Sequence, residues 1–429
     1  MKLLCTGDLH LGRSPSRLPA DLSRASISVA ERWREIVDLA IREEVDVVAM
    51  SGDLVDRANR FFEAYGPLES GIRRLAEAAI TTVAVAGNHD FDILPQLSRT
   101  LPAERFRLLG ASGVWERVTL TDRAGDRLDV HGWSFPSERV SADPLDLYAL
   151  EADPALPTLG LLHCELNASG GRYAPVSEVA LRSRPPGLWL LGHVHDKRLR
   201  SAPGGADLLY PGSPQPLDPG EPGAHGVWLV ETAGSDFTTP RFLPTATVRY
   251  ESLAVEVDGV DDVDGVRMAI ATAAERLRDT VAEAGVPVNC LSLRIDVVGR
   301  SRLRRRVLED EVAAHASDLD LPGEIRCVVE RVRVITRPAL DLEELTSSGD
   351  APGVLARLLV SDGSGAPTAE VAVLVEEIRA LERQVDSASV YLPLRARVSP
   401  AAPYRDAEAL LREQANLLLE ELVAQKGGA

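Results

Sequence analysis

The sequence predicts a layered α/β fold with a largely parallel sheet, followed by a small α/β cap domain and C-terminal helices. Short apolar runs rich in β-branched residues or leucine alternate with helix-like stretches in the first half of the chain. Each run ends where a polar loop begins, and the pattern changes near residue 249. With 429 residues, the chain is expected to form two or three domains.

The strands expected in the first domain each deliver a polar loop at their carboxyl end. They cover residues 1–8, 45–51, 80–86, 157–162 and 187–191. Helix-like segments follow some of the loops, as at 28–43 and 64–79. Because parallel strands present their carboxyl ends at one edge of a sheet, this arrangement gathers residues that are far apart in sequence. A single site built from distant motifs is therefore expected at that edge.

The first domain is expected to cover 1–245 and the cap domain 249–345. In the cap, alternating patterns predict strands at 250–257, 291–298 and 325–335 and helices at 262–284 and 303–316. Residues 346–367 are rich in Gly, Ser, Asp and Pro, which is typical of a linker. Two helices, 368–385 and 405–426, are expected in a C-terminal helical region over 368–429.

Composition narrows the class of protein. Apolar residues at 45% and charged residues at 26% are ordinary for a globular protein, and no apolar run approaches the roughly 20 residues of a membrane span. The four scattered cysteines form no metal-type pair, and the first polar motif begins too early for a signal peptide, so a cytoplasmic location is expected. The net charge of −18 argues against a generally basic nucleic-acid-coating protein, but not against a nuclease with bound cations.

Five short motifs in the first 195 residues carry side chains suited to two metal ions, and they contain five of the eight histidines. They are Asp8-Leu-His10, Gly52-Asp-Leu-Val-Asp-Arg57, Gly87-Asn-His-Asp90, His163 in Leu-Leu-His-Cys-Glu, and Gly192-His-Val-His195. Two cations about 3.5–4 Å apart can bind phosphoryl oxygens during an in-line displacement. Such a pair needs a bridging carboxylate, for which Asp53 is the candidate.

The remaining ligands divide into two sets. Asp8, His10 and His195 would complete the shell of one metal. Asn88, His163 and His193 would complete the shell of the other. The i, i+2 spacing within a motif puts both side chains on one side of an extended segment, so one metal could take both or two metals could take one each. Imidazole, carboxylate and amide ligands suit Mn(II), Fe(II) or Zn(II).

His89 is expected to stay off the metals and to stabilise charge on the reacting phosphate or to protonate the leaving oxygen. Asp56 could hydrogen-bond His89 and favour its charged form. Asp90 is expected to shape the loop or to support a ligand, and not to bind a metal itself. The histidines outside the motifs are expected to be structural at position 131 and on the surface at positions 225 and 315.

Together the five motifs resemble those of the calcineurin-like metallophosphoesterases. With Gly132-Trp-Ser-Phe135 and Tyr210-Pro-Gly-Ser-Pro214, the chain is similar to the SbcD-type nuclease subunits of DNA repair, and its later region is similar to the YhaO-type branch. The resemblance implies a β-sandwich flanked by helices, and Mn²⁺-dependent 3′–5′ exonuclease and endonuclease action on DNA. It also implies that Asp8, His10, Asp53, Asn88, His163, His193 and His195 are the ligands and that His89 is catalytic.

Members of that family work with an SMC-like ATPase of the SbcC type, which docks onto C-terminal helices, and they typically form a homodimer. An apolar face of this kind could be offered by Leu374, Ile378, Leu381, Leu410, Leu411, Leu417, Leu418 and Leu422, although these residues could equally pack within their own domain. Phosphate contacts are expected from cations beside the motifs, namely Arg13, Arg57, Lys197 and Arg198.

Two other functions share these motifs. One is a phosphodiesterase or phosphatase acting on nucleotides or other small molecules. The other is a regulatory subunit that binds an SMC-like ATPase with weak or no hydrolysis. The complete ligand set argues against the second, because a scaffold would have no need of it.

Overall fold

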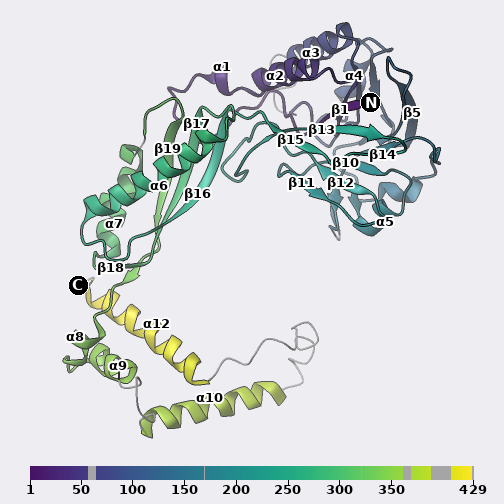
Figure 1. Ribbon diagram of the computed structural model, residues 1–429. Helices are drawn as coiled ribbons and strands as arrows, with labels where there is room; N and C mark the ends of the chain where they lie inside the picture. The colour runs from purple at the N-terminus through teal and green to yellow at the C-terminus, as the bar shows by residue number, and fades with distance from the viewer. Residues whose placement is uncertain (57–63, 169, 320, 361–368, 388–406, 428–429) are drawn as a thin grey trace. The chain divides into compact units, whose positions relative to one another are not determined.

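The computed structural model describes the chain except for residues 57–63, 169, 320, 361–368, 388–406 and 428–429 (Figure 1). The chain divides into two compact units. The first comprises Met1–Ser252, Ala274–Arg294 and Asp320–Glu330, and the second comprises Leu253–Ala273, Ile295–Leu319 and Arg331–Ala429. Among the described residues, no helix is both long enough and apolar enough to cross a membrane.

Two sheets form the centre of the first unit. The first sheet has the order β14-β13-β1-β2-β3-β4, with β15 paired to β13. Strands β1 to β4 are parallel, and β13 runs antiparallel to β1. The strands are β1 (Lys2–Thr6), β2 (Val47–Met50), β3 (Thr81–Ala84), β4 (Phe106–Leu108), β13 (Gly226–Ala233), β14 (Asp236–Phe237) and β15 (Arg241–Pro244).

The second sheet has the order β11-β12-β10-β7-β6-β5. Its four central strands are parallel, and its two edge strands, β5 and β11, are antiparallel to their neighbours. The strands are β5 (Glu116–Thr121), β6 (Arg127–Trp133), β7 (Thr158–His163), β10 (Leu188–Gly192), β11 (Arg198–Arg200) and β12 (Asp207–Tyr210). A short pair, β8 (Glu165–Leu166) and β9 (Pro175–Val176), follows β7.

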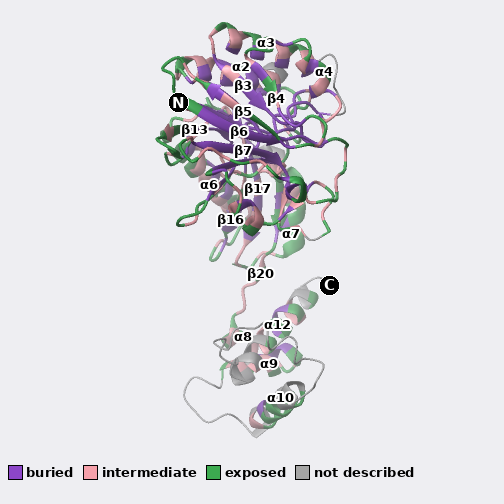
Figure 2. Cartoon of the chain, turned by 90° about the vertical axis from the view of Figure 1, so that its right-hand side faces the viewer, coloured by how far each residue is buried: buried purple, intermediate pink, exposed green. Residues whose placement is uncertain are grey.

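The two sheets pack face to face, as the apolar side chains between them show. Leu3 and Cys5 of β1 share one buried cluster with Leu161 of β7 and Leu190 of β10. Leu4, which points to the opposite side of β1, belongs instead to the cluster beneath the helices. Figure 2 shows strands of both sheets, among them β3 and β7, coloured as buried. The β-sandwich expected from the family resemblance is confirmed.

Helices cover the outer faces of this sandwich (Figure 1). α2 (Val29–Arg42), α3 (Tyr65–Glu77) and α4 (Leu94–Ser98) lie on the first sheet, preceded by α1 (Arg24–Ile27), and the indole of Trp33 is fully buried there. The Ser28 hydroxyl accepts a hydrogen bond from the Glu31 amide and caps α2. α5 (Glu178–Arg182) and the 3-10 helix η3 (Pro144–Leu147) lie on the second sheet. The helices predicted at 28–43 and 64–79 are confirmed.

Each strand and helix predicted between residues 249 and 345 has a counterpart in the structure. A three-stranded sheet has the order β16-β17-β19, formed by β16 (Val248–Glu256), β17 (Cys290–Val298) and β19 (Arg326–Val334). The helices are α6 (Val263–Glu283), α7 (Arg305–Glu311) and the 3-10 segment η4 (Ala313–Leu319). A small parallel pair joins β18 (Arg300–Ser301) to β20 (Arg337–Pro338).

Four further helices follow: α8 (Leu342–Thr346), α9 (Ala351–Val360), α10 (Ala369–Ser387) and α12 (Ala407–Gly427). Part of the predicted linker is therefore helical, because the apolar run inside α9 outweighs its Gly- and Ser-rich flanks. α12 is fixed within the second unit by Glu420, whose buried carboxylate lies 2.8 Å from Arg300 and 3.7 Å from Arg337.

The leucines predicted as an apolar docking face divide into two groups. Ile378 and Leu411 pack against Val375, where α10 meets α12. Four of them are exposed, namely Leu374, Leu381, Leu417 and Leu418. Leu422 is half-buried, and the side chain of Leu410 lies outside the described part.

Candidate metal centre

The five motifs meet at one rim of the β-sandwich, and both sheets contribute to it. The first sheet delivers Asp8 after β1, Asp53 after β2 and Asn88 after β3. The second sheet delivers His163 at the end of β7 and His193 after β10. All five side chains are buried or half-buried. The rim is therefore a polar region beside the apolar cores of the sandwich. The motif residues are therefore brought together at strand ends, as expected. The strands belong to two sheets, whereas the sequence suggested one.

Asp8, His10 and His195 form the first group, and their ligand atoms lie within 4.8 Å of one another. The Nε2 atoms of His10 and His195 face each other at 3.0 Å. A single proton or a cation can satisfy two such lone pairs, and a carboxylate beside them favours a cation. This donor set fits a divalent metal ion.

Asp53, Asn88 and His163 form the centre of the second group. His163 Nε2 lies 3.3 Å from Asp53 Oδ2 and 3.1 Å from Asn88 Oδ1. The imidazole of His193 lies edge-on to that of His163, with the ring centroids 5.3 Å apart. Asp53 Oδ2 is also 3.9 Å from His10 Nε2 in the first group. One carboxylate therefore reaches both groups, as a bridging ligand must.

The charges in this cluster depend on one another. Burial alone would raise the pKa of Asp53, but the imidazoles of His163, His10 and His89 outweigh burial and hold it far below its usual value. Burial would lower the pKa of His163, yet the carboxylate of Asp53 raises it to about 9. Burial lowers the pKa of His193 to about 3. The site therefore combines a carboxylate that stays ionised with two imidazoles whose pKa values are shifted in opposite directions, upward for His163 and downward for His193.

The ligand positions are held in backbone conformations that side chains rarely adopt. φ is positive at Asp8 (48°), His10 (50°), Asp53 (51°) and His193 (91°). Each such residue costs about 1–3 kcal/mol, and this cost persists only where the surrounding structure imposes it. The same rim explains the motif glycine at position 87, because a Cβ there would stand 2.2 Å from Asp53 Oδ1. Strain at four predicted ligands points to a site built for function.

His89 lies beside the two groups and is partly open to solvent. Its ring packs edge-on against His10 at 4.8 Å, and its side chain is 36% exposed. Its Nδ1 is 3.6 Å from Asp56 Oδ2, which is longer than a hydrogen bond. Burial lowers the pKa of His89 despite the nearby carboxylates of Asp53 and Asp56. The predicted proximity of Asp56 is present, but the expected hydrogen bond and the raised pKa are not.

Asp90 ties two of the motif loops together. Its Oδ1 accepts a hydrogen bond from the Gly87 amide at 2.7 Å, and its Oδ2 accepts one from the Leu54 amide at 2.6 Å. Burial and the charge of Asp53 raise the pKa of this carboxyl to about 7. The loop-shaping role expected from the sequence agrees with this geometry.

Sequence reasoning missed the residues that support the imidazole ligands from behind. Glu221 accepts a hydrogen bond from His195 Nδ1, with its Oε1 at 2.8 Å. Glu165 lies 3.6 Å from His193 Nε2, and the Ser51 carbonyl lies 3.1 Å from His163 Nδ1. Glu221 follows the last recognisable motif by several residues, so no local pattern identifies it. Only the course of the loop after β12 brings it to the site.

Three histidines lie outside the motifs. His131 is buried and its Nδ1 is 2.6 Å from the hydroxyl of Tyr148, which agrees with a structural role. His315 is exposed, as expected. The expected surface position of His225 is wrong, because its imidazole is buried and its Nδ1 lies 2.7 Å from the Ser213 carbonyl. His225 therefore helps to hold the loop before β13 through its contact with Ser213.

The cations predicted to contact DNA differ in their surroundings. Arg13 is 41% exposed and lies 3.9 Å from Asp56 at the edge of the site. Lys197 donates to the Ala224 carbonyl at 2.7 Å and covers the ring of Phe242. Arg198 is paired with Asp196, and Arg57 lies outside the described residues. Of the three described cations, Arg13 is the one whose side chain lies beside a predicted catalytic residue, Asp56.

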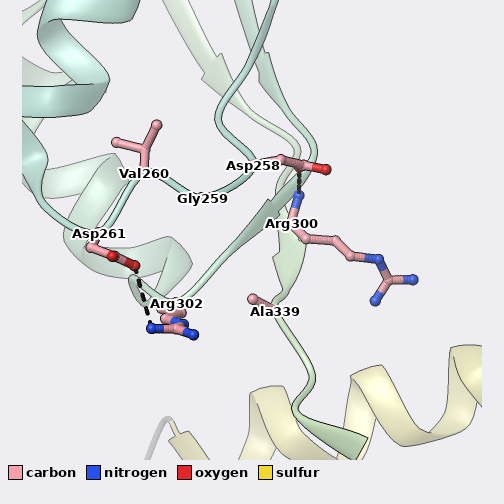
Figure 3. Close-up of a pocket in the computed structure, with 7 residues that line it drawn as sticks. All are labelled: Asp258, Gly259, Val260, Asp261, Arg300, Arg302 and Ala339. Carbon is pink, nitrogen blue, oxygen red and sulfur yellow. Dashed lines mark hydrogen bonds and ion pairs between the residues drawn. The ribbon is translucent and has the colours of Figure 1, made fainter.

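The second unit contains a pocket of about 280 Å³ with two arginines, shown in Figure 3. Arg300 donates its backbone amide to Asp258, and its side chain pairs with Glu420. Arg302 lies 3.7 Å from Asp261. The two guanidinium groups point apart in Figure 3, and each has an acidic neighbour. The pocket therefore does not offer two converging cations to an anion.

Comparison with known proteins matches the part of the chain that carries these motifs. The family model of the calcineurin-like phosphoesterases matches residues 1–197. The uncharacterized metallophosphoesterase YhaO of Bacillus subtilis is 28% identical over 293 residues, which cover 67% of this chain and 69% of that protein. Two proteins described as DNA double-strand break repair protein Mre11 also match. That of Sulfolobus acidocaldarius is 25% identical over 80% of this chain and 84% of its own length. That of Methanopyrus kandleri is 24% identical over 80% of each chain.

Proposed function

We propose, from the premise that residues 1–197 are a calcineurin-like metallophosphoesterase domain, that this chain is a DNA nuclease. It hydrolyses phosphodiester bonds as a 3′–5′ exonuclease and endonuclease, with Mn²⁺ as the preferred metal. It serves as the nuclease subunit of an SbcCD-like repair complex. The coarser activity, metal-dependent hydrolysis of phosphoesters at a dinuclear site, is that of the family.

One observation carries the proposal: Asp53 lies between two sets of ligands and within reach of both. His10 Nε2 and His163 Nε2 are 3.9 Å and 3.3 Å from Asp53 Oδ2. The two relatives described as double-strand break repair proteins match across 80% of this chain, well beyond the phosphoesterase motifs. The likeness over the later part of the chain favours DNA over a small ester as the substrate.

A bound pair of divalent cations supplies Lewis-acid polarisation of the phosphoryl oxygens and an activated water at neutral pH. Asp8, His10 and His195 would hold one cation, and Asn88, His163 and His193 the other, with Asp53 shared. Asp90 keeps the loops of Asp53 and Asn88 in register through two backbone amides.

His89 is placed to act on the substrate and not on the metals. Its partly exposed ring stands beside the first group, 4.8 Å from the ring of His10, and is open to a substrate. It stabilises negative charge or donates a proton to the leaving oxygen. Asp56, at 3.6 Å, favours the protonated ring once a negatively charged phosphate offsets the cost of burial.

The partner in this proposal is an SMC-like ATPase of the SbcC type. Leu374 and Leu381 of α10 and Leu417 and Leu418 of α12 are exposed large apolar side chains. In this proposal they contribute to the docking surface, because helices recognise partners through apolar positions at helical spacing. A homodimer is also part of the proposal by family resemblance.

The test is cleavage of labelled single- and double-stranded DNA by the purified chain with Mn²⁺, Mg²⁺ or EDTA. p-Nitrophenyl monoesters and diesters are assayed beside it, and His89→Ala serves as the inactive control. Manganese-dependent loss of DNA that disappears in the variant supports the proposal.

Two outcomes contradict it. Hydrolysis of small esters with DNA untouched, even with the ATPase added, assigns a nucleotide or small-molecule phosphoesterase. Capture of the ATPase with no hydrolysis of any ester under any metal assigns a regulatory subunit.

A further inference from the structure

We infer that Glu221 is a positioning residue for the metal ion held by Asp8, His10 and His195, and that it acts on this ion selectively. It does so through the imidazole of His195. The inference rests on the dinuclear phosphoesterase site and is independent of whether DNA is the substrate.

The two nitrogens of His195 face different partners. Nδ1 lies 2.8 Å from Oε1 of Glu221, while Nε2 lies 3.0 Å from Nε2 of His10. A carboxylate can only accept, so Nδ1 must carry the proton that it donates to Glu221. The lone pair of Nε2 is then directed at the ligand group. A carboxylate behind a ligating imidazole fixes the ring and makes it a stronger donor to metal.

Glu221 is itself held in place by the loop after β12. Its Oε2 accepts hydrogen bonds from the Ser213 hydroxyl at 3.1 Å and from the Leu217 amide at 3.0 Å. The Ser213 amide in turn donates to the carbonyl of His195 at 3.0 Å. The Glu221 side chain is only 13% exposed. The loop thus holds the backbone of His195 through the Ser213 amide and the imidazole of His195 through Glu221.

The segment Tyr210-Pro-Gly-Ser-Pro214, to which Ser213 belongs, spans the end of β12 and the start of this loop. His225 adds a further contact, with its Nδ1 at 3.0 Å from the Ser213 hydroxyl. Ser213 of that segment therefore helps to hold the Glu221 carboxylate beside His195. Such an arrangement explains why a polar network is buried at Ser213 and His225.

The selectivity follows from how the other metal's imidazoles are supported. His163 Nδ1 faces the backbone carbonyl of Ser51 at 3.1 Å, which no substitution of a side chain removes. His193 lies 3.6 Å from Glu165 and does not contact Glu221 at hydrogen-bond distance in the described structure. Loss of Glu221 is therefore expected to lower the affinity for the ion held by His195 and to leave the affinity for the other ion unchanged.

The experiment is calorimetric titration of the metal-free full-length chain with Mn²⁺, together with the Mn²⁺ electron paramagnetic resonance spectrum of each variant. Glu221→Ala and Glu221→Gln are compared with Glu178→Gln, a glutamate whose side chain is 25% exposed and bonded to Arg182 and Arg200. In Glu221→Ala, the affinity for one of two ions is expected to fall about 10–100-fold, with the other within about 2-fold. Glu221→Gln keeps an acceptor oxygen, so a smaller fall is expected.

Glu221→Gln also decides the question should the alanine variant fail to fold. Two ions bound by this variant with wild-type affinities and an unchanged resonance spectrum would overturn the inference. An equal loss of both ions in a folded variant would overturn the selectivity. A wild-type chain that binds two ions but leaves DNA uncut would contradict the proposed nuclease and leave the role of Glu221 standing.

Discussion

The two ligand groups on either side of Asp53 are supported in different ways. His10 and His195 have side-chain carboxylates behind their Nδ1 atoms, with Asp56 at 3.5 Å and Glu221 at 2.8 Å. His163 has the backbone carbonyl of Ser51 there, and its own side chain is fully buried at the end of β7. In the first half both imidazoles thus have a side-chain carboxylate behind Nδ1, whereas in the second half His163 is supported by the backbone and the carboxylate of Glu165 lies 3.6 Å from His193.

This difference predicts that side-chain substitutions can change the metal affinity of the first half without changing the fold, whereas the second half is constrained by the backbone. A side-chain carboxylate can be replaced without moving a strand, so metal affinity in the first half is open to adjustment. The second half depends on close backbone contacts, as at Gly192, where a Cβ would stand 2.1 Å from the Ser51 carbonyl. Changes there disturb the packing of one sheet on the other.

Replacing Asp53 with Asn is expected to have the largest effect, because this residue belongs to both halves. In the proposed site the Asp53 carboxylate would hold both cations, so its loss should lower hydrolysis by about 10³-fold or more. Metal content after dialysis, measured by mass spectrometry, should fall from two ions per chain. Asp196→Asn, at an exposed pair with Arg198, is the matched control. Retention of two tightly bound ions in Asp53→Asn would break the bridging assignment.

Replacing His89 with Ala should lower turnover by about 10²–10⁴-fold and leave metal binding unchanged, because His89 is proposed to act on the substrate and not as a ligand. Turnover of a diester substrate and the metal content of the same sample provide the two measurements. Loss of a metal ion in this variant would make His89 a ligand and remove it from the catalytic role.

Gly87→Ala tests the half that depends on the backbone. The added methyl would meet Asp53 Oδ1 at 2.2 Å, so the loop must shift at a cost of about 1–3 kcal/mol in stability. A lower thermal midpoint and a weaker metal complex are expected. Gly205→Ala is the control, since the nearest atom to a Cβ there is 3.8 Å away. Equal midpoints for the two variants would show that the loop has room that the structure does not indicate.

The pH dependence of the metal-free chain tests the charge pair of Asp53 and His163. The folded-state pKa of His163 is about 9, above the ordinary value for histidine of about 6.5. Its stabilising contribution is therefore complete below about pH 6.5 and is lost as the pH rises through about 9. Thermal midpoints measured from pH 6 to 9.5 should fall, and less so with saturating metal, which replaces the proton. An identical decline in His163→Gln would assign it to another group.

The smallest effect is expected at the edge of the first half, where Arg13 lies. Arg13→Ala should weaken DNA binding a few-fold and lower the salt slope by about one. Arg198→Ala should change less, because that guanidinium already pairs with Asp196. The measurement is the DNA affinity of both variants over a range of salt concentrations. An equal fall in affinity for Arg13→Ala and Arg198→Ala would contradict the predicted difference between the two arginines.

The strand ends and the ligand motifs were readable from the sequence because each is local. An apolar run followed by Gly-Asp or Gly-Asn specifies both a buried strand and the polar loop at its end. Glu221, the burial of His225 and the support of His163 by Ser51 depend on contacts across the sandwich, which no window of sequence contains. The helix α9 was missed because its glycine- and serine-rich flanks dominated the pattern.

The most direct test of the two-group account is anomalous diffraction from crystals soaked in Mn²⁺. The account predicts two peaks about 3.5–4 Å apart on either side of the Asp53 carboxylate. One should lie among Asp8, His10 and His195, and the other among Asn88, His163 and His193. A single peak, or a second peak away from Asp53, would contradict it.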